Sequence, residues 1–125
     1  MHKPTILVVD DDGPILVLMR SVLREFGFET VTAASGEEAI AAAREARPGL
    51  VLLDRHMPGM NGDEVIRALR ASDGSHMPIL MLSGEPLTRR ELAALGADGA
   101  ITKPFDVVEL VKQIRTYLAP AAASE

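Results

Sequence analysis

Strand-like and helix-like segments alternate five times along this chain of 125 residues. The strand-like segments are short and rich in β-branched residues, and several are apolar on both faces, which is typical of parallel strands covered by helices on two sides. Because the connections are short, the alternation predicts one α/β domain with a parallel sheet. The expected strands are TILVV (5–9), ETVTA (29–33), LVLLD (50–54), PILMLS (78–83) and GAITK (99–103).

The first helix-like segment has recognisable ends. Pro14 stands near its first turn and Gly27 at its end, the positions at which helices tolerate proline and favour glycine. Apolar residues at helical spacing between the two predict the face that packs on the sheet. They are Ile15, Leu18, Val22 and Phe26.

The other helices carry comparable signals. Ser35 with Glu38, and Thr88 with Glu91, fit the capping-box pattern and place the starts of the second and fourth helices. The third helix is expected to begin near Asn61. The remaining signals are the N-cap Asp106 and two apolar stripes, Val65, Ile66 and Leu69 in the third helix and Val107, Leu110, Val111, Ile114 and Leu118 in the fifth.

Right-handed crossovers around a parallel sheet leave few topologies for such a chain. Five strands with five helices favour a three-layer, doubly wound sandwich of the flavodoxin-like type, with strand order 2-1-3-4-5. The length suits a single core, so we assign 1–119 to one domain and 120–125 to a flexible C-terminal tail.

Charge and composition exclude several classes of protein. The net charge is −5 and no dense block of basic residues occurs, so direct binding of nucleic acid by this chain is not expected. The absence of cysteine rules out disulfides and thiolate metal sites. No apolar run approaches the roughly 20 residues that span a bilayer, and no signal-peptide pattern is present, so we expect no membrane association and a cytoplasmic location.

Charged and polar side chains follow four of the five expected strands. Three consecutive carboxylates, 10–12, follow the first strand, and Asp54, Ser83 and Lys103 end the third, fourth and fifth. The carboxyl ends of parallel strands meet at one edge of the sheet, where ligands bind in folds of this kind. Clustered carboxylates repel one another unless a cation offsets their charge, and oxygen ligands suit Mg²⁺. A lysine opposite a metal-bound carboxylate is the arrangement expected around a phosphoryl group.

Four stretches at these strand ends, VVDDD, LLDRHMPGMNG, MLSG and ITKPF, occur in the order and at the separations found in a known family. The chain resembles the response regulator receiver domain of two-component signal transduction systems, the CheY-like superfamily, from about Thr5 to Leu118. The resemblance implies a phosphoprotein that takes a phosphoryl group from a sensor histidine kinase or a histidine phosphotransfer protein. It also implies a conformational change that reaches a downstream effector.

The resemblance assigns the acidic residues to roles. Asp54 would be the phosphoacceptor. Asp11 would bind Mg²⁺ directly and Asp10 mainly through water, with the backbone carbonyl of His56 as a further ligand and Mn²⁺ as the alternative metal. Asp12 lies one place beyond the matched pair, so we expect it to cap the following helix and leave it out of the metal site.

Two further residues complete the site that the resemblance implies. Ser83 would be the hydroxyl that moves to the phosphoryl group, and Lys103 the amine that forms an ion pair with it. The peptide bond between Lys103 and Pro104 is expected to be cis, as is common in the family. For Ser83 a turn cap is the alternative.

Several positions depart from the family pattern or tune it. Ala100 stands where an aromatic residue usually moves inward with the hydroxyl, which leaves open how a change at the site reaches the face of the fourth helix, fifth strand and fifth helix. Arg55 follows the acceptor, where an apolar residue is usual. His56 and Glu85 are expected to flank the entrance and to modulate the lifetime of the phosphoryl group.

We expect no conventional enzyme, because such a chain assists only its own phosphorylation and dephosphorylation. One alternative is a degenerate receiver that binds partners without phosphorylation, an option kept open by Ala100. Another is a small Mg²⁺-dependent phosphatase with an aspartyl nucleophile, but it needs a second carboxylate where this chain has Arg55 and His56. A flavin-binding module needs a phosphate loop after the first strand, where carboxylates would repel the phosphate. We expect a monomer or a weak dimer.

Overall fold

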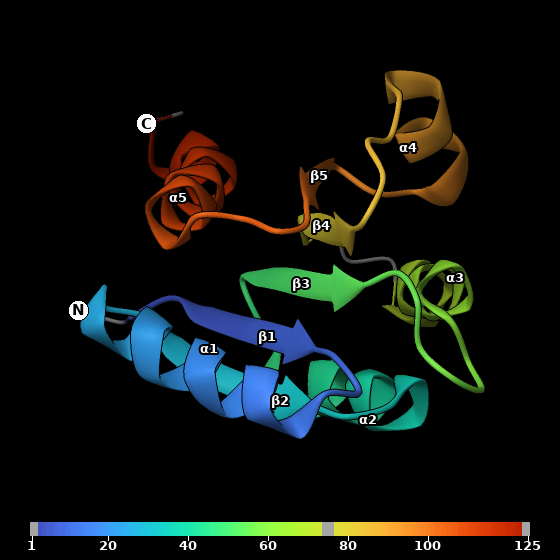
Figure 1. Cartoon of the computed structure of the whole chain (residues 1–125), viewed down its shortest axis with the longest axis horizontal. Helices are drawn as coiled ribbons and strands as arrows, with labels where there is room; N and C mark the ends of the chain where they lie inside the picture. The colour runs from blue at the N-terminus through green and yellow to red at the C-terminus, as the bar shows by residue number, and fades with distance from the viewer. Residues whose placement is uncertain (1–2, 74–76, 124–125) are drawn as a thin grey trace.

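The computed structural model describes residues 3–73 and 77–123, within which five strands alternate with five helices (Figure 1). The strands form one parallel sheet in the order β2-β1-β3-β4-β5, which confirms the predicted topology. Compared with the expected ranges, β4 starts one residue later and β5 ends one residue earlier. The strands are β1 Thr5–Val9, β2 Glu29–Ala33, β3 Leu50–Asp54, β4 Ile79–Ser83 and β5 Gly99–Thr102.

The helices are α1 Gly13–Glu25, α2 Gly36–Ala46, α3 Gly62–Asp73, α4 Arg89–Leu95 and α5 Val107–Ala123. Among the described residues, none of the helices is both long and apolar enough to cross a membrane. Helix α5 includes residues 120–123 of the expected tail, and residues 124–125 lie outside the described part. The division of the chain at residue 119 stays a prediction.

The helix starts agree closely with the predicted capping residues. The capping box of Thr88 and Glu91 at α4 is present in full. At α2, Ser35 accepts the N–H of Glu38 as predicted, but the Glu38 carboxylate accepts from the N–H of Ala34, one residue earlier than in the expected box. In both cases a side chain satisfies backbone N–H groups that the first turn of a helix leaves unpaired.

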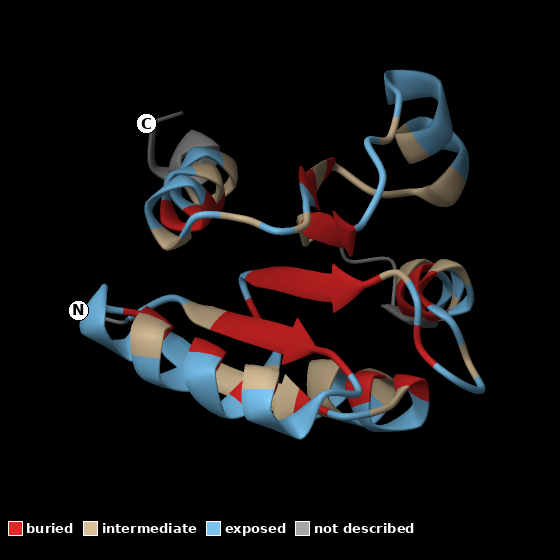
Figure 2. Cartoon of the chain, in the orientation of Figure 1, coloured by how far each residue is buried: buried red, intermediate tan, exposed pale blue. Residues whose placement is uncertain are grey.

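The sheet carries an apolar core on each face, and its central strands are buried along their length (Figure 2). Successive residues of a strand point to opposite faces, so Ile6 and Val8 of β1 pack with α1 and α5, whereas Leu7 and Val9 pack with α2 and α3. The predicted stripes of α3 and α5 are largely confirmed. Buried are Val65, Ile66, Leu69, Leu110, Val111 and Ile114, and partly buried are Val107 and Leu118.

The predicted face of α1 is wrong. Leu16, Met19 and Leu23 are the buried residues of this helix. Of the predicted set, Ile15 and Val22 are only partly buried, and Leu18 and Phe26 are 56% and 37% exposed. Helix α1 carries two apolar rows offset by one residue, about 100° apart around the axis, so helical spacing alone does not identify the row that faces the sheet.

A cluster of polar groups lies at the amino end of the sheet. The guanidinium of Arg70 on α3 donates to the carbonyls of Gly96 and Met77, at 3.0 Å and 2.7 Å, and to the carboxylate of Asp98, at 2.8 Å. The same carboxylate accepts the N–H of Ile79 at 2.8 Å. The cluster therefore joins α3 to the segments that enter β4 and β5.

Candidate functional site

Three carboxylates meet at the opposite, carboxyl end of the sheet. Asp10 follows β1 and Asp54 ends β3, and both side chains are buried, whereas Asp11 is exposed. Strands β1 and β3 are neighbours with Val9 opposite Leu53, so the next residue of each strand comes to the same place. One carboxylate oxygen from each of the three residues lies within 4.8 Å of the others.

Lys103 brings a positive charge to this group from the far side of β4. Its Nζ lies 3.2 Å from Asp54 Oδ1 and 3.9 Å from Asp10 Oδ2. The backbone N–H of Lys103 donates to the carbonyl of Ser83 at 2.7 Å, which continues the pairing of β4 and β5 up to the site. The peptide bond to Pro104 is cis, as expected. The predicted convergence of Lys103 with the carboxylates is therefore present.

The charged form of the Asp10 carboxyl is disfavoured at this position. Burial raises the pKa of the Asp10 carboxyl above its ordinary value of 3.8, and the charges of Asp54 and Asp11 act in the same direction. The N–H of Asp12, which donates to Asp10 Oδ1 at 3.0 Å, and the charge of Lys103 lower the pKa and oppose the rise. One ammonium does not balance three carboxylates, so the site favours a further cation.

Ser83 lies at the site but is engaged elsewhere. It is buried at the end of β4, one residue past Leu82, which pairs with Asp54. Its Oγ donates to the carbonyl of Glu85 at 2.8 Å and accepts the N–H of Glu85 at 3.1 Å. Both hydrogen bonds lie within the turn after β4, as the turn-cap alternative predicts, and the hydroxyl hydrogen is directed to Glu85.

A family model shows what kind of domain carries this site. The model described as the response regulator receiver domain matches residues 6–115. The chain belongs to the response regulator receiver domain family. Curated relatives of this receiver domain include the DNA-binding response regulator MtrA of Mycobacterium tuberculosis, 47% identical over 118 residues, and the transcriptional regulatory protein PrrA of the same organism, 41% identical. Each match covers 93% of this chain but only 51% and 50% of the relatives, so the chain spans about half their length.

The fold of this receiver domain is similar to the folds of solved structures. The chemotaxis protein CheY4 of Vibrio cholerae superposes with a TM-score of 0.88 at 36% identity, over 94% of this chain and all of that one. The receiver domain of the sensor histidine kinase PA1611 of Pseudomonas aeruginosa superposes with a TM-score of 0.83 at 26% identity, over 94% of this chain and 99% of that one. That structure has a magnesium ion coordinated in its active-site cleft.

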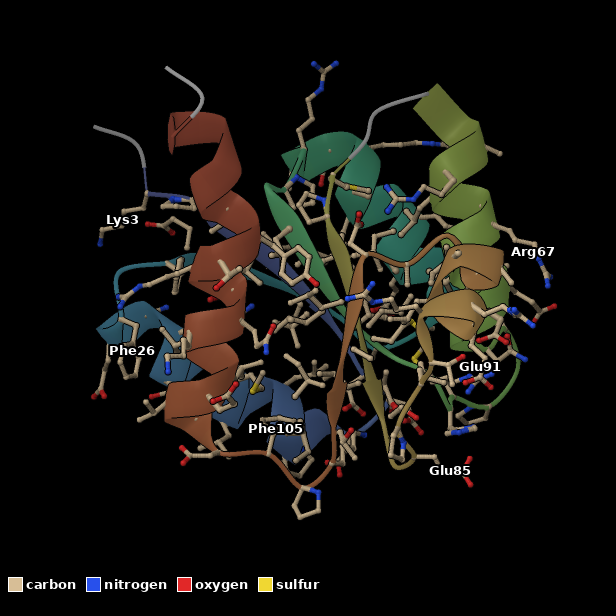
Figure 3. All side chains as sticks on the ribbon, turned by 90° about the horizontal axis from the view of Figure 1, so that it is seen from above. Lys3, Phe26, Arg67, Glu85, Glu91 and Phe105 are labelled. Carbon is tan, nitrogen blue, oxygen red and sulfur yellow. The ribbon has the colours of Figure 1, made fainter. Side chains whose placement is uncertain are left out.

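Of the residues predicted to tune the site, His56 is in direct contact with it. The N–H of His56, an exposed residue, donates to Asp54 Oδ1 at 3.3 Å. Glu85 is exposed in the turn after β4 and lies at the same end of the molecule as Phe105 (Figure 3). Ala100, opposite Met81 on β4, is half-buried and packs on the core beneath α2 and α3. Asp12 caps α1 by accepting the N–H of Ile15 and is not among the grouped carboxylates, as expected.

The acidic cleft of the receiver domain continues into an apolar groove that sequence reasoning missed. The whole hollow measures about 610 Å³. Its acidic part contains the carboxylates and Lys103, and its apolar part lies between α1 and the start of α5. The apolar wall comprises Ile15, Leu18, Met19, Val22, Phe105 and Val107. Three of these residues belong to the α1 row that was predicted to be buried, so that row was the signal for the groove.

Proposed function

We propose that this receiver domain accepts a phosphoryl group on Asp54 in a Mg²⁺-dependent reaction and that phosphorylation switches it to its signalling state. One observation carries the proposal. The buried Asp54 carboxylate lies 3.2 Å from the ammonium of Lys103 and within 4.8 Å of ligand oxygens of Asp10 and Asp11. A nucleophile, a fixed cation and the ligands for a divalent ion are thereby combined at one point.

The proposed reaction moves the phosphoryl group between two protein side chains. An oxygen of Asp54 attacks the phosphorus of a phosphohistidine on the donor; the P–O bond forms as the P–N bond breaks, and the imidazole leaves with the electron pair and takes up a proton. In the reverse of activation, water attacks the phosphorus, inorganic phosphate leaves and the carboxylate is restored. The domain assists these two steps on itself and turns over no external substrate.

Asp10, Asp11 and Asp54 would hold the Mg²⁺ ion, together with the backbone carbonyl of His56, and Mn²⁺ is the alternative. The fit is supported by two buried carboxylates, Asp10 and Asp54, whose mutual repulsion a divalent ion relieves. When bound, the ion neutralises negative charge on the phosphoryl oxygens. The ammonium of Lys103, 3.2 Å from Asp54 Oδ1, would do the same.

The switch that we propose uses Ser83 and Lys103, because both would contact the phosphoryl group and only one of the two states offers those contacts. Ser83 would exchange its bonds to Glu85 for a bond to a phosphoryl oxygen, which changes the turn before α4. The change would then reach the face formed by α4, β5 and α5. His56 and Glu85, at the entrance, would set how quickly water removes the group.

The apolar part of the groove supports a protein as the phosphoryl donor, because a small donor needs no such wall. We propose that a sensor histidine kinase or a histidine phosphotransfer protein packs there and presents its phosphohistidine to Asp54. The output would be an effector domain or protein, since MtrA is named a DNA-binding response regulator and is about twice as long as this chain. The proposed domain is 1–119, working in the cytoplasm as a monomer or weak dimer.

The test is incubation with a small acyl phosphate and Mg²⁺, followed by intact mass measurement of the wild type and of Asp54→Asn. We expect one added phosphoryl mass in the wild type only, and none without the metal. Lack of uptake by the wild type, or equal uptake by the two proteins, would overturn the assignment.

Ala100 favours a second candidate, a receiver that binds partners without phosphorylation. The methyl group leaves no ring to move when Ser83 moves. Under this alternative, partner affinity is the same for the untreated and the phosphorylated wild type. We expect instead that phosphorylation changes that affinity, which titration of either form with the partner measures.

A further inference from the structure

A second hollow, separate from the acidic cleft, lies on the face of the molecule that α1 and α5 form. It measures about 480 Å³ and lies between the carboxyl end of α1 and residues 108–116 of α5, two helices that cover the same face of the sheet (Figure 1). We call this hollow the basic groove. Its lining residues are Phe26, Val108, Val111, Lys112, Arg115 and Thr116.

The apolar part of the basic groove is open to water. Val108 is 65% exposed and Phe26 is 37% exposed. Among the described residues, the other exposed large hydrophobic side chains are Val17 and Leu18, so all four belong to α1, to its C-cap or to α5. Exposed apolar side chains that gather on one face of a protein are typical of a surface that binds another protein.

The charged side chains that line the basic groove are both cationic. Lys112 and Arg115 are exposed, and neither forms an ion pair with a carboxylate in the part of the chain that the structure describes. The carboxylates of Glu25 and Glu109 are close in sequence but do not line the groove. Because the whole chain carries a net charge of −5, this groove is a place where an acidic partner meets attraction in place of repulsion.

The side chain of Arg115 is held in position without a partner. Its guanidinium donates to the backbone carbonyl of Phe26 at 3.3 Å and lies 5.9 Å from the ring centroids of Phe26 and Phe28. These contacts restrict the side-chain freedom that binding would otherwise remove. A guanidinium has five N–H donors, and the described residues accept from one of them, so donors remain for a carboxylate of a partner.

We propose that the basic groove is a docking surface for an acidic amphipathic segment of a partner protein. Apolar side chains of the segment would pack on Phe26 and Val108, and its carboxylates would pair with Lys112 and Arg115. A symmetric contact with a second copy of this chain fits less well, because the copy would bring the same two cations to the interface. The basic groove and the acidic cleft share no lining residue, so the proposal does not depend on the phosphoacceptor role of Asp54.

The test is titration of the isotope-labelled protein with a synthetic helical peptide that has leucines along one face and glutamates along the other. Amide shifts locate the binding site, and their dependence on peptide concentration gives the dissociation constant. The variants are Lys112→Glu and Val108→Ser. Their matched controls are Arg44→Glu on α2 and Val17→Ser on α1, because both residues are exposed and lie outside the groove. A peptide with lysine in place of glutamate tests the charge, and thermal unfolding checks that each variant is folded.

We expect amide shifts at residues 26–28 and 108–116. The dissociation constant should rise about fivefold in Lys112→Glu and in Val108→Ser, because each loses one exposed contact, and should stay within about twofold of the wild type in the controls. Absence of binding, shifts at other residues, equal effects in variants and matched controls, or equal binding of the lysine peptide would each overturn the proposal. Shifts at residues 108–116 that depend on protein concentration without peptide would also overturn it and assign this face to a second copy of the chain.

Discussion

The two ends of the sheet each carry a polar cluster, and the difference between them is the balance of charge. At the amino end Arg70 faces one carboxylate, that of Asp98, and its remaining donors go to backbone carbonyls. At the carboxyl end Lys103 faces the grouped carboxylates of residues 10, 11 and 54. Both clusters join strands that are distant in sequence. Only the second leaves charge that the described residues do not neutralise.

Burial of polar groups therefore does not by itself mark a functional site in this molecule. Removing one partner from a balanced cluster leaves an uncompensated charge and destabilises the fold, whereas an unbalanced cluster carries repulsion that a bound cation relieves. The amino end should respond to mutation as a structural element, and the carboxyl end should respond to metal and to pH.

The largest effect is expected from Asp98→Ala. The substitution leaves the guanidinium of Arg70 without its carboxylate and the N–H of Ile79 without its acceptor. We expect a loss of about 2–3 kcal/mol in the free energy of unfolding, measured with urea. Glu45→Ala, which removes an exposed carboxylate of α2, is the control and should change stability by less than about 0.5 kcal/mol. Equal losses of stability in Asp98→Ala and Glu45→Ala would show that the amino-end cluster does not stabilise the fold.

Magnesium should act at the other end. At a concentration ten times its dissociation constant, a ligand specific to the folded state stabilises by about 1.4 kcal/mol. We expect this gain in the wild type and its loss in Asp11→Asn. Asp12→Asn changes the charge equally but keeps a helix-capping side chain outside the carboxylate group, so it should retain the gain. Loss of the Mg²⁺ stabilisation in both variants would indicate nonspecific attraction of the ion to acidic residues and not a defined binding site.

The contrast between the two ends also explains what the sequence could predict. The sequence identified three site residues because each ends an expected β-strand and parallel strands bring their carboxyl ends together. These residues are Asp54, Ser83 and Lys103. Arg70 and Asp98 belong to no local pattern, since they are separated by 28 residues and their pairing depends on how α3 packs. The turn that holds Ser83 was foreseen only as an alternative, because a hydroxyl bonds its own backbone as readily as a distant partner.

For a related reason, the sequence does not determine which face of α1 is buried. Leu16 and Leu18 are equally apolar, and only the position of the helix on the sheet decides that Leu16 is buried and Leu18 is 56% exposed. Periodicity identifies a helix and its apolar rows. Which row meets the core and which lines the groove is a property of tertiary packing.

A smaller effect, on the order of 1 kcal/mol, is expected from Asp10→Asn without divalent ions. The pKa of Asp10 is raised in the folded state by burial and by nearby carboxylates, so the folded protein binds this proton more tightly than the unfolded chain. The stabilisation is therefore complete below the ordinary value of 3.8 and is lost as the pH rises through the raised pKa. Asparagine should remove this pH dependence and stabilise the protein near neutral pH.

Urea unfolding at about pH 4 and about pH 7 measures the difference for Asp10→Asn, with Asp12→Asn again as the control. The wild type should lose more stability between the two conditions than Asp10→Asn does. Parallel curves for these two proteins would mean that the repulsion among the carboxylates is already relieved by Lys103, and the case for a missing cation would weaken.

The smallest effect on stability is expected from Tyr117→Phe, a change at the amino end of the sheet. The hydroxyl of Tyr117 on α5 donates to the backbone carbonyl of Asp98 at 3.0 Å, in a place where a methyl group on Gly99 would collide with it. Its loss removes one neutral, partly exposed hydrogen bond, worth about 0.5–1 kcal/mol by urea unfolding. Stabilisation by Mg²⁺ should be unchanged, because no charge is altered and the site lies at the other edge. A reduced gain from Mg²⁺ in this variant would show that the two ends of the sheet are energetically coupled through β5.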